Sequence, residues 1–161
     1  MIKNTARTSD FHTPEFLPFS DEISPDAEYC YVGRLFLSSP NADAVMWWRN
    51  AKGGCQYRCV VTGAYSEPVP GRAVANRKIE CGEFTALLDK LVSLGILDIP
   101  SQPTTQIISH SDRLVSIKLA DGRSNTYAIR GGVPADPRAR DIGFLIYEMA
   151  PDFYPETRRK R

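Results

Sequence analysis

Cysteine is the residue type in this chain best suited to bind a metal or to form a cross-link, and it occurs four times, as Cys30, Cys55, Cys59 and Cys81. Cys55 and Cys59 lie in a segment that alternates like a β-strand, where four residues span roughly 13 Å at about 3.3 Å each. That distance is too long for two ligands of one zinc ion. We therefore expect no metal or other cofactor, and we interpret all four cysteines as buried thiols in a reducing compartment.

Histidine and serine could serve a hydrolase, but their spacing does not favour one. His12 lies in a proline-rich N-terminal arm, and His110, Ser111 and Asp112 are consecutive on an expected turn. A hydrolytic triad needs its nucleophile, base and acid to face one another, which three consecutive side chains on a turn cannot do. The sequence also contains no HExxH motif, nucleophile elbow or phosphate-binding GxxxxGK[ST] loop. It therefore predicts a protein that is not an enzyme.

Three arginines, Arg130, Arg138 and Arg140, surround a glycine-rich loop that leads to an expected helix start. Backbone N–H groups at a helix start, together with arginines, can bind a nucleotide or another small anion. Asp136, however, is a good N-cap whose carboxylate would occupy those N–H groups, and Pro137 removes one of them. Ordinary helix initiation is therefore the favoured interpretation, and a nucleotide or small-molecule sensor is the alternative function.

A tryptophan-containing hairpin supplies the leading candidate for a binding surface. In its second limb, the odd positions 57, 59 and 61 are apolar or aromatic and the even positions 56 and 58 are polar. Pairing 45 with 59 and 47 with 57 turns the odd side chains towards the core and places Met46 and Trp48 beside Arg58 on the other face. Since these residue types are enriched at protein interfaces, we predict a partner-binding set of Met46, Trp48 and Arg58, assisted by Phe11 and Phe16. The alternative is that the N-terminal arm or a second layer of the domain covers this face.

Two helices are expected to position these residues. Residues 83–99 read as an amphipathic helix that stops at Gly95, which can adopt a left-handed conformation. Its apolar face follows the i, i+3, i+4, i+7 spacing and comprises Phe84, Leu87, Leu88 and Leu91. A second helix is predicted to start after Asp136. Its buried stripe is expected to comprise Ile142, Leu145, Ile146 and Met149.

The remaining apolar segments read as strands. They are residues 29–38, the two limbs of the tryptophan hairpin, residues 72–80 as an edge strand, and a second hairpin around Asp121. A three-residue loop, Ala120–Gly122, pairs 119 with 123 and 115 with 127 and keeps the apolar faces of that hairpin together. The sequence therefore predicts an α+β fold, an antiparallel sheet of about five to seven strands with two helices packed on one face.

Length and composition bound the domain organisation. With 161 residues, 42% of them hydrophobic, the chain can bury one core. We expect an extended arm at residues 1–28, a single domain at 29–154 and a basic tail at 155–161. The net charge of +1 argues against nucleic acid as a partner. The sequence has neither a run of about 20 apolar residues nor a signal-peptide core, so we expect no membrane association and a cytoplasmic location.

The stretch from Tyr57 to Met149 resembles the small α+β proteins of the emfourin type in its order of strand, helix, hairpin and helix. The segments that carry the likeness are FTALLDKLVSLGIL, VSIKLADGRSNTYAI and DPRARDIGFLIYEM. Because that family includes inhibitors of metalloproteases, the resemblance implies a protein that binds and inhibits another protein. No inhibitory residue is matched to a position here, and the arm and the tryptophan hairpin depart from the family pattern. Together with the composition, this predicts a non-catalytic protein-binding module of the inhibitor or immunity type.

Overall fold

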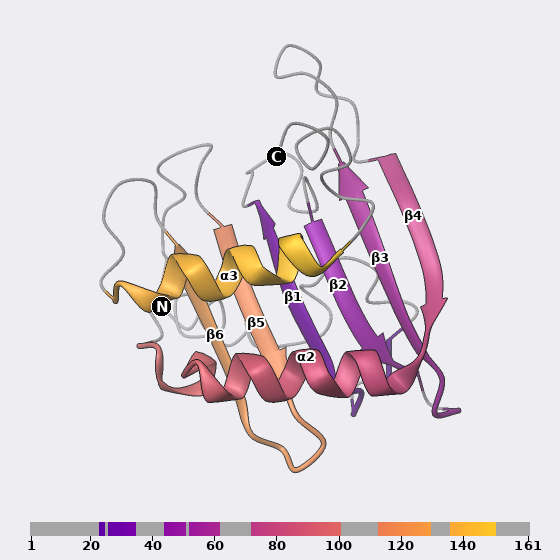
Figure 1. Cartoon of the computed structure of the whole chain (residues 1–161), viewed down its shortest axis with the longest axis horizontal. Helices are drawn as coiled ribbons and strands as arrows, with labels where there is room; N and C mark the ends of the chain where they lie inside the picture. The colour runs from indigo at the N-terminus through magenta and orange to yellow at the C-terminus, as the bar shows by residue number, and fades with distance from the viewer. Residues whose placement is uncertain are drawn as a thin grey trace, which may run out of the picture.

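The computed structural model describes residues 23–24, 26–34, 44–50, 52–61, 72–100, 113–129 and 136–150. Within them, six strands form one antiparallel sheet in the order β4-β3-β2-β1-β5-β6. The elements in chain order are β1 (Tyr29–Arg34), β2 (Ala44–Arg49), β3 (Cys55–Val61), β4 (Arg72–Ile79), α2 (Cys81–Ser93), the 3-10 helix η3 (Ile96–Asp98), β5 (Arg113–Lys118), β6 (Ser124–Ile129) and α3 (Arg138–Met149). Both α2 and α3 cross the same face of the sheet (Figure 1). This confirms the expected α+β fold.

Helix α2 buries the face that its sequence spacing predicts. Its buried side chains are Phe84, Leu87, Leu88 and Leu91. Each such side chain contributes roughly 1.5–3 kcal/mol when it leaves water, which is ample to hold one helix on a sheet. The helix ends where Gly95 adopts a φ of 96°, and the chain then turns back so that Ile96 enters the core. The predicted left-handed stop is therefore confirmed.

A buried amide ties this turn to the far edge of the sheet. The side chain of Asn125 on β6 donates to the backbone carbonyls of Ile96 and Ile99, both at 2.8 Å. Both carbonyls lie just past the end of α2, where helix geometry provides no partner for them. One side chain thus satisfies two buried acceptors and fixes the end of α2 against β6.

Helix α3 comes closest to the sheet at Gly143. A Cβ built there would stand 2.9 Å from methyl carbons of Val115 and Ile129, so only glycine fits without a shift. This contact rotates the helix slightly from the predicted stripe, because its buried residues are Ala139, Ile142, Gly143, Ile146 and Tyr147. Leu145 is only half-buried and Met149 is exposed, so the prediction was wrong for Met149.

Both hairpins have the predicted registers. Val45 pairs with Cys59 and Trp47 with Tyr57, and the latter two rings stack with centroids 4.7 Å apart. In the second hairpin Leu119 N–H donates to the carbonyl of Arg123 at 2.9 Å, which closes the three-residue loop. Gly122 has the left-handed φ of 91° that this loop requires. The odd-numbered side chains of β2 and β3 therefore face the helices, as alternation indicates.

Strand β4 lies at one edge of the sheet, as predicted for residues 72–80. Its register with β3 shifts between Cys59 and Val60, which marks a bulge. Side chains 76 to 78 are exposed at the end that leads into α2. None of the helices in the described ranges is both long and apolar enough to span a bilayer.

Candidate functional site

The face of the sheet turned away from α2 and α3, behind the sheet in Figure 1, carries a second apolar cluster. Its members come from β1, β2, β5 and the segment before β1, and they are Ile23, Ala27, Tyr29, Tyr31, Ala44, Met46, Trp48 and Leu114. The sheet is therefore buried on both faces at β1, β2 and β5. Ile23 and Ala27 belong to the end of the predicted N-terminal arm, so that end of the arm packs against the sheet.

Two residues of the predicted partner-binding set lie inside this second cluster. Met46 is 0% exposed and Trp48 is 1% exposed. They do share a face with Arg58, because Met46 pairs with Arg58 and Trp48 with Gln56 in the β2–β3 register. Alternation thus assigned the face correctly, but a partner cannot touch these two side chains in this conformation. The alternative, that the chain itself covers this face, fits their burial.

Arg58 lies between the second apolar cluster and the protein surface. Its side chain is half-buried, and its Cζ lies 5.8 Å from the centroid of the Trp48 ring. A cation over an indole face is attracted by the ring quadrupole, and the contact restricts the rotamers of the arginine. An arginine held in this way loses less entropy on binding than a freely rotating one.

Neighbours of Arg58 on the same face are polar and more accessible. Asn76 of β4 pairs with Arg58, and Lys78 pairs with Gln56. Asn76 and Lys78 are exposed, and Gln56 is half-buried. We call these four residues, Gln56, Arg58, Asn76 and Lys78, the polar rim. Its two cations lie beside a buried tryptophan and methionine at the β4 edge of the sheet.

Elsewhere on this face, buried hydroxyls satisfy one another. Ser116 Oγ lies 2.8 Å from Thr126 Oγ1 and 3.3 Å from the hydroxyl of Tyr29. Burial raises the pKa of Tyr29, although its hydrogen bond with Ser116 works in the opposite direction. The chain of hydroxyls links β1, β5 and β6 and supplies no charged group near neutral pH. It serves to hold the sheet together.

At the start of α3, the predicted anion-binding position is taken up by an ion pair between Asp136 and Arg138. Asp136 accepts the backbone N–H of Arg138 at 2.9 Å, and its other carboxylate oxygen contacts the Arg138 guanidinium at 2.8 Å. These hydrogen bonds to Arg138 hold the pKa of Asp136 below its usual value. Asp136 therefore binds the first N–H of α3 and engages Arg138, although the helix begins at Arg138, with Pro137 rather than Asp136 in the N-cap position. Arg140 is exposed, and Arg130 lies outside the described residues.

Two of the four cysteines form a disulfide, so the expectation of four thiols was wrong for Cys55 and Cys81. The bond joins the first residue of β3 to the first residue of α2, with Cα atoms 5.2 Å apart. Cys30 and Cys59 form no disulfide and are fully buried, as expected. Within the described ranges, no group of three or more His, Cys, Asp or Glu residues could hold a metal ion.

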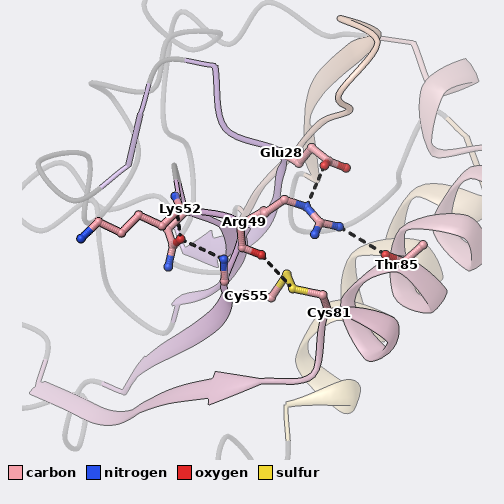
Figure 2. The surroundings of a disulfide bond; sticks show 9 residues. Glu28, Arg49, Lys52, Cys55, Cys81 and Thr85 are labelled. Atoms are coloured by element: carbon pink, nitrogen blue, oxygen red, sulfur yellow. Dashed lines mark hydrogen bonds and ion pairs between the residues drawn. A yellow bond between two sulfur atoms is a disulfide. The ribbon is translucent and has the colours of Figure 1, made fainter.

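An ion pair and a side-chain hydrogen bond surround the disulfide (Figure 2). Arg49, opposite Cys55 in the β2–β3 register, donates from Nε to Glu28 at 3.0 Å and from Nη2 to Thr85 on α2 at 3.4 Å. One arginine thus connects β2, the segment before β1 and the N-terminal part of α2. Sequence patterns gave no indication of this junction, because its members come from four separate segments.

Several predicted candidates fall outside the residues that the structure describes. They are Phe11 and Phe16, His12, the His110–Asp112 group and the basic tail at 155–161. Of the members of the predicted partner-binding set that the structure describes, Arg58 is the one that is not buried. No protein-family model and no curated protein matches the sequence.

Proposed function

We propose that this chain is a non-catalytic protein-binding module of the inhibitor or immunity type, acting in the cytoplasm. The polar rim is its contact surface. The observation that supports this most directly is the half-buried Arg58 held over the buried Trp48 ring at 5.8 Å. Arginine and tryptophan are the residue types that most often dominate binding energy at protein interfaces. Of the contact set Met46, Trp48 and Arg58 that the sequence predicts, we now assign Arg58 to the contact surface and the two buried side chains to the layer beneath it.

Charge indicates what kind of partner surface fits. Arg58 and Lys78 place two cations on one face of the β3–β4 pair, flanked by the amides of Gln56 and Asn76. Carboxylates on the partner would be attracted by these two cations. An acidic protein surface therefore complements the polar rim. The resemblance to emfourin-type inhibitors favours the same class of function.

Site-specific photo-crosslinking tests this assignment without advance knowledge of the partner. A photoreactive amino acid is placed at Asn76, within the polar rim, and in a second variant at Asp89, which is exposed on α2 on the other side of the sheet. We expect irradiation in the native cell to yield one defined cross-linked protein from position 76 and none from position 89. The same adducts from both positions, or none from position 76, would remove the proposal.

A further inference from the structure

The disulfide stands between two elements that are each anchored independently. Cys55 begins β3, whose side chains Tyr57 and Cys59 are buried, and Cys81 begins α2, which Phe84 and Leu87 fix to the core. The bond therefore closes the corner of the β3–β4–α2 unit (Figure 2). Opening it need not remove either element from the core.

The two bonded cysteines differ in exposure. Cys55 is 2% exposed, whereas Cys81 is only half-buried. Thiol–disulfide exchange requires a thiolate to reach one sulfur of the bond, so accessibility decides which sulfur is attacked. Cys81 is also the first residue of α2, and no side chain caps that helix end. A helix N-terminus favours the negative charge that develops on the sulfurs during exchange.

The leaving sulfur also has a favourable neighbour. Cys55 lies directly opposite Arg49 in the β2–β3 register, and the Arg49 side chain extends to Thr85 on α2. Side chains opposite one another in an antiparallel pair have Cβ atoms about 4.5–5.5 Å apart. An arginine therefore lies across the strand pair from the cysteine that leaves as a thiolate, and its charge is shared with Glu28, whose Oε1 lies 3.0 Å from Arg49 Nε.

The other two cysteines are excluded from exchange by burial. Cys30 and Cys59 are both 0% exposed. Burial also raises the pKa of the Cys30 thiol far above its usual value, so that it stays protonated and unreactive. Reshuffling to a different pair would require the sheet to open.

We infer that Cys81 is the reactive sulfur of a reversible disulfide, which a dithiol reductant opens in the folded protein. A thiolate of the reductant attacks Cys81 Sγ, a mixed disulfide forms, and the Cys55–Cys81 bond breaks with its electron pair passing to Cys55 Sγ, which takes up a proton. The second thiolate of the reductant then attacks the reductant's other sulfur, which is bonded to Cys81 Sγ in the mixed disulfide. This step closes the oxidised reductant and releases Cys81, which takes up the second proton.

In the reduced protein, a hydrogen-bond acceptor lies close to the Cys81 thiol. Cys81 Sγ lies 3.3 Å from the carbonyl oxygen of Gly53 in the β2–β3 turn. Once it carries a proton, the thiol can donate to that oxygen, which it cannot do as part of a disulfide. We expect reduction to loosen the first turn of α2 while residues 87–91 remain packed.

Two experiments test the inference on the full chain. Wild-type protein is treated with dithiothreitol in native buffer, alkylated and analysed by mass spectrometry, and hydrogen exchange is followed in α2. We expect Cys81 to be alkylated first, Cys55 more slowly because it is buried, and Cys30 and Cys59 not at all, with faster exchange at residues 81–85 but not at 87–91. Reduction that occurs only in denaturant, or alkylation of all four cysteines together, would overturn the inference.

Variants that lack one cysteine of the bonded pair identify the attacked sulfur. Cys55→Ser leaves Cys81 to react with glutathione disulfide, and Cys81→Ser leaves Cys55. We expect the first variant to form the mixed disulfide at least tenfold faster, and Cys59→Ala to keep the wild-type response to dithiothreitol. Equal rates, or faster reaction at Cys55, would show that Cys81 is not the entry point. If a variant fails to fold, the wild-type alkylation pattern still decides.

Discussion

Arg58 lies over the indole ring of Trp48, with 5.8 Å between its Cζ and the ring centroid. Trp48 is buried in the second apolar cluster, whereas Arg58 is half-buried and reaches the surface. In the binding surface that we propose, Trp48 lies beneath the contact layer, and Arg58 with its neighbours on β4 makes up that layer. This division of roles leads to different expectations for the two residues.

Substitution of Trp48 should act on stability. Replacing a buried tryptophan by alanine removes its apolar contacts and leaves a cavity, so we expect Trp48→Ala to lower the free energy of unfolding by about 3–5 kcal/mol. Arg58→Ala removes a partly exposed cation–π contact and should cost about 0.5–1 kcal/mol. Urea unfolding of both variants measures the difference. If the tryptophan variant were as stable as the arginine variant, Trp48 would not be buried as the structure has it.

The disulfide should make a measurable contribution to stability. Its cysteines are 26 residues apart in the sequence. Closing a loop of that length in the unfolded chain corresponds to about 3.5 kcal/mol in the chain-entropy description. We expect Cys81→Ser to lose approximately that amount in guanidinium unfolding under oxidising conditions, and to respond to dithiothreitol no further. A variant whose stability still falls on adding the reductant would indicate that a different pair is bonded.

Replacing Asn125 should lower the stability of the fold far more than replacing an exposed asparagine. Asn125→Ala leaves the carbonyls of Ile96 and Ile99 without their side-chain donor inside the protein, and we expect a loss of about 1–3 kcal/mol. Asn76→Ala, on the exposed end of β4, is the matched control and should change stability by less than about 0.5 kcal/mol. Thermal unfolding of both proteins at one pH gives the comparison. Similar melting temperatures would mean that the amide does not hold the end of α2.

Acid should weaken the start of α3 through Asp136. Hydrogen bonds to Arg138 lower its pKa in the folded protein, so the folded state binds the proton less readily than the unfolded state. The resulting stabilisation is present above the unfolded value, about 3.9, and is lost as the pH falls through the lower, folded value. Asp136→Asn should remove this part of the pH dependence. Stability measured from pH 6 to pH 2 in both proteins checks it, and parallel curves would contradict the assignment.

Alternation along the strands was sufficient to predict both hairpins. The odd and even positions of β3 differ clearly in polarity, and only one register of each hairpin keeps the apolar faces together. Helix α2 could be predicted equally well, since its four buried residues follow the helical period and Gly95 ends it. These features depend on residues close together in the sequence, where local patterns carry the information.

Features that depend on distant segments were missed. The burial of Met46 and Trp48 had one available signal, the uninterrupted apolar run AVMWW, which is typical of a strand covered on both faces. The disulfide required the β3–β4 register, which pairs Cys55 with Ile79 and so brings Cys81 close. The weak apolar content of β4 gave no means to predict that register. The two acceptors of Asn125 could not be identified because they are backbone carbonyls on another element.

The central claim is that Arg58, on the polar rim, contacts a protein partner. It is tested most directly by the dissociation constant of the partner cross-linked from position 76, measured for wild type, Arg58→Ala and Arg140→Ala. Arg140 is an exposed arginine at the start of α3 and serves as the matched control. We expect Arg58→Ala to weaken binding at least tenfold, or about 1.4 kcal/mol, and Arg140→Ala to leave it unchanged. Equal affinity in all three proteins would contradict the assignment of the polar rim as the binding surface.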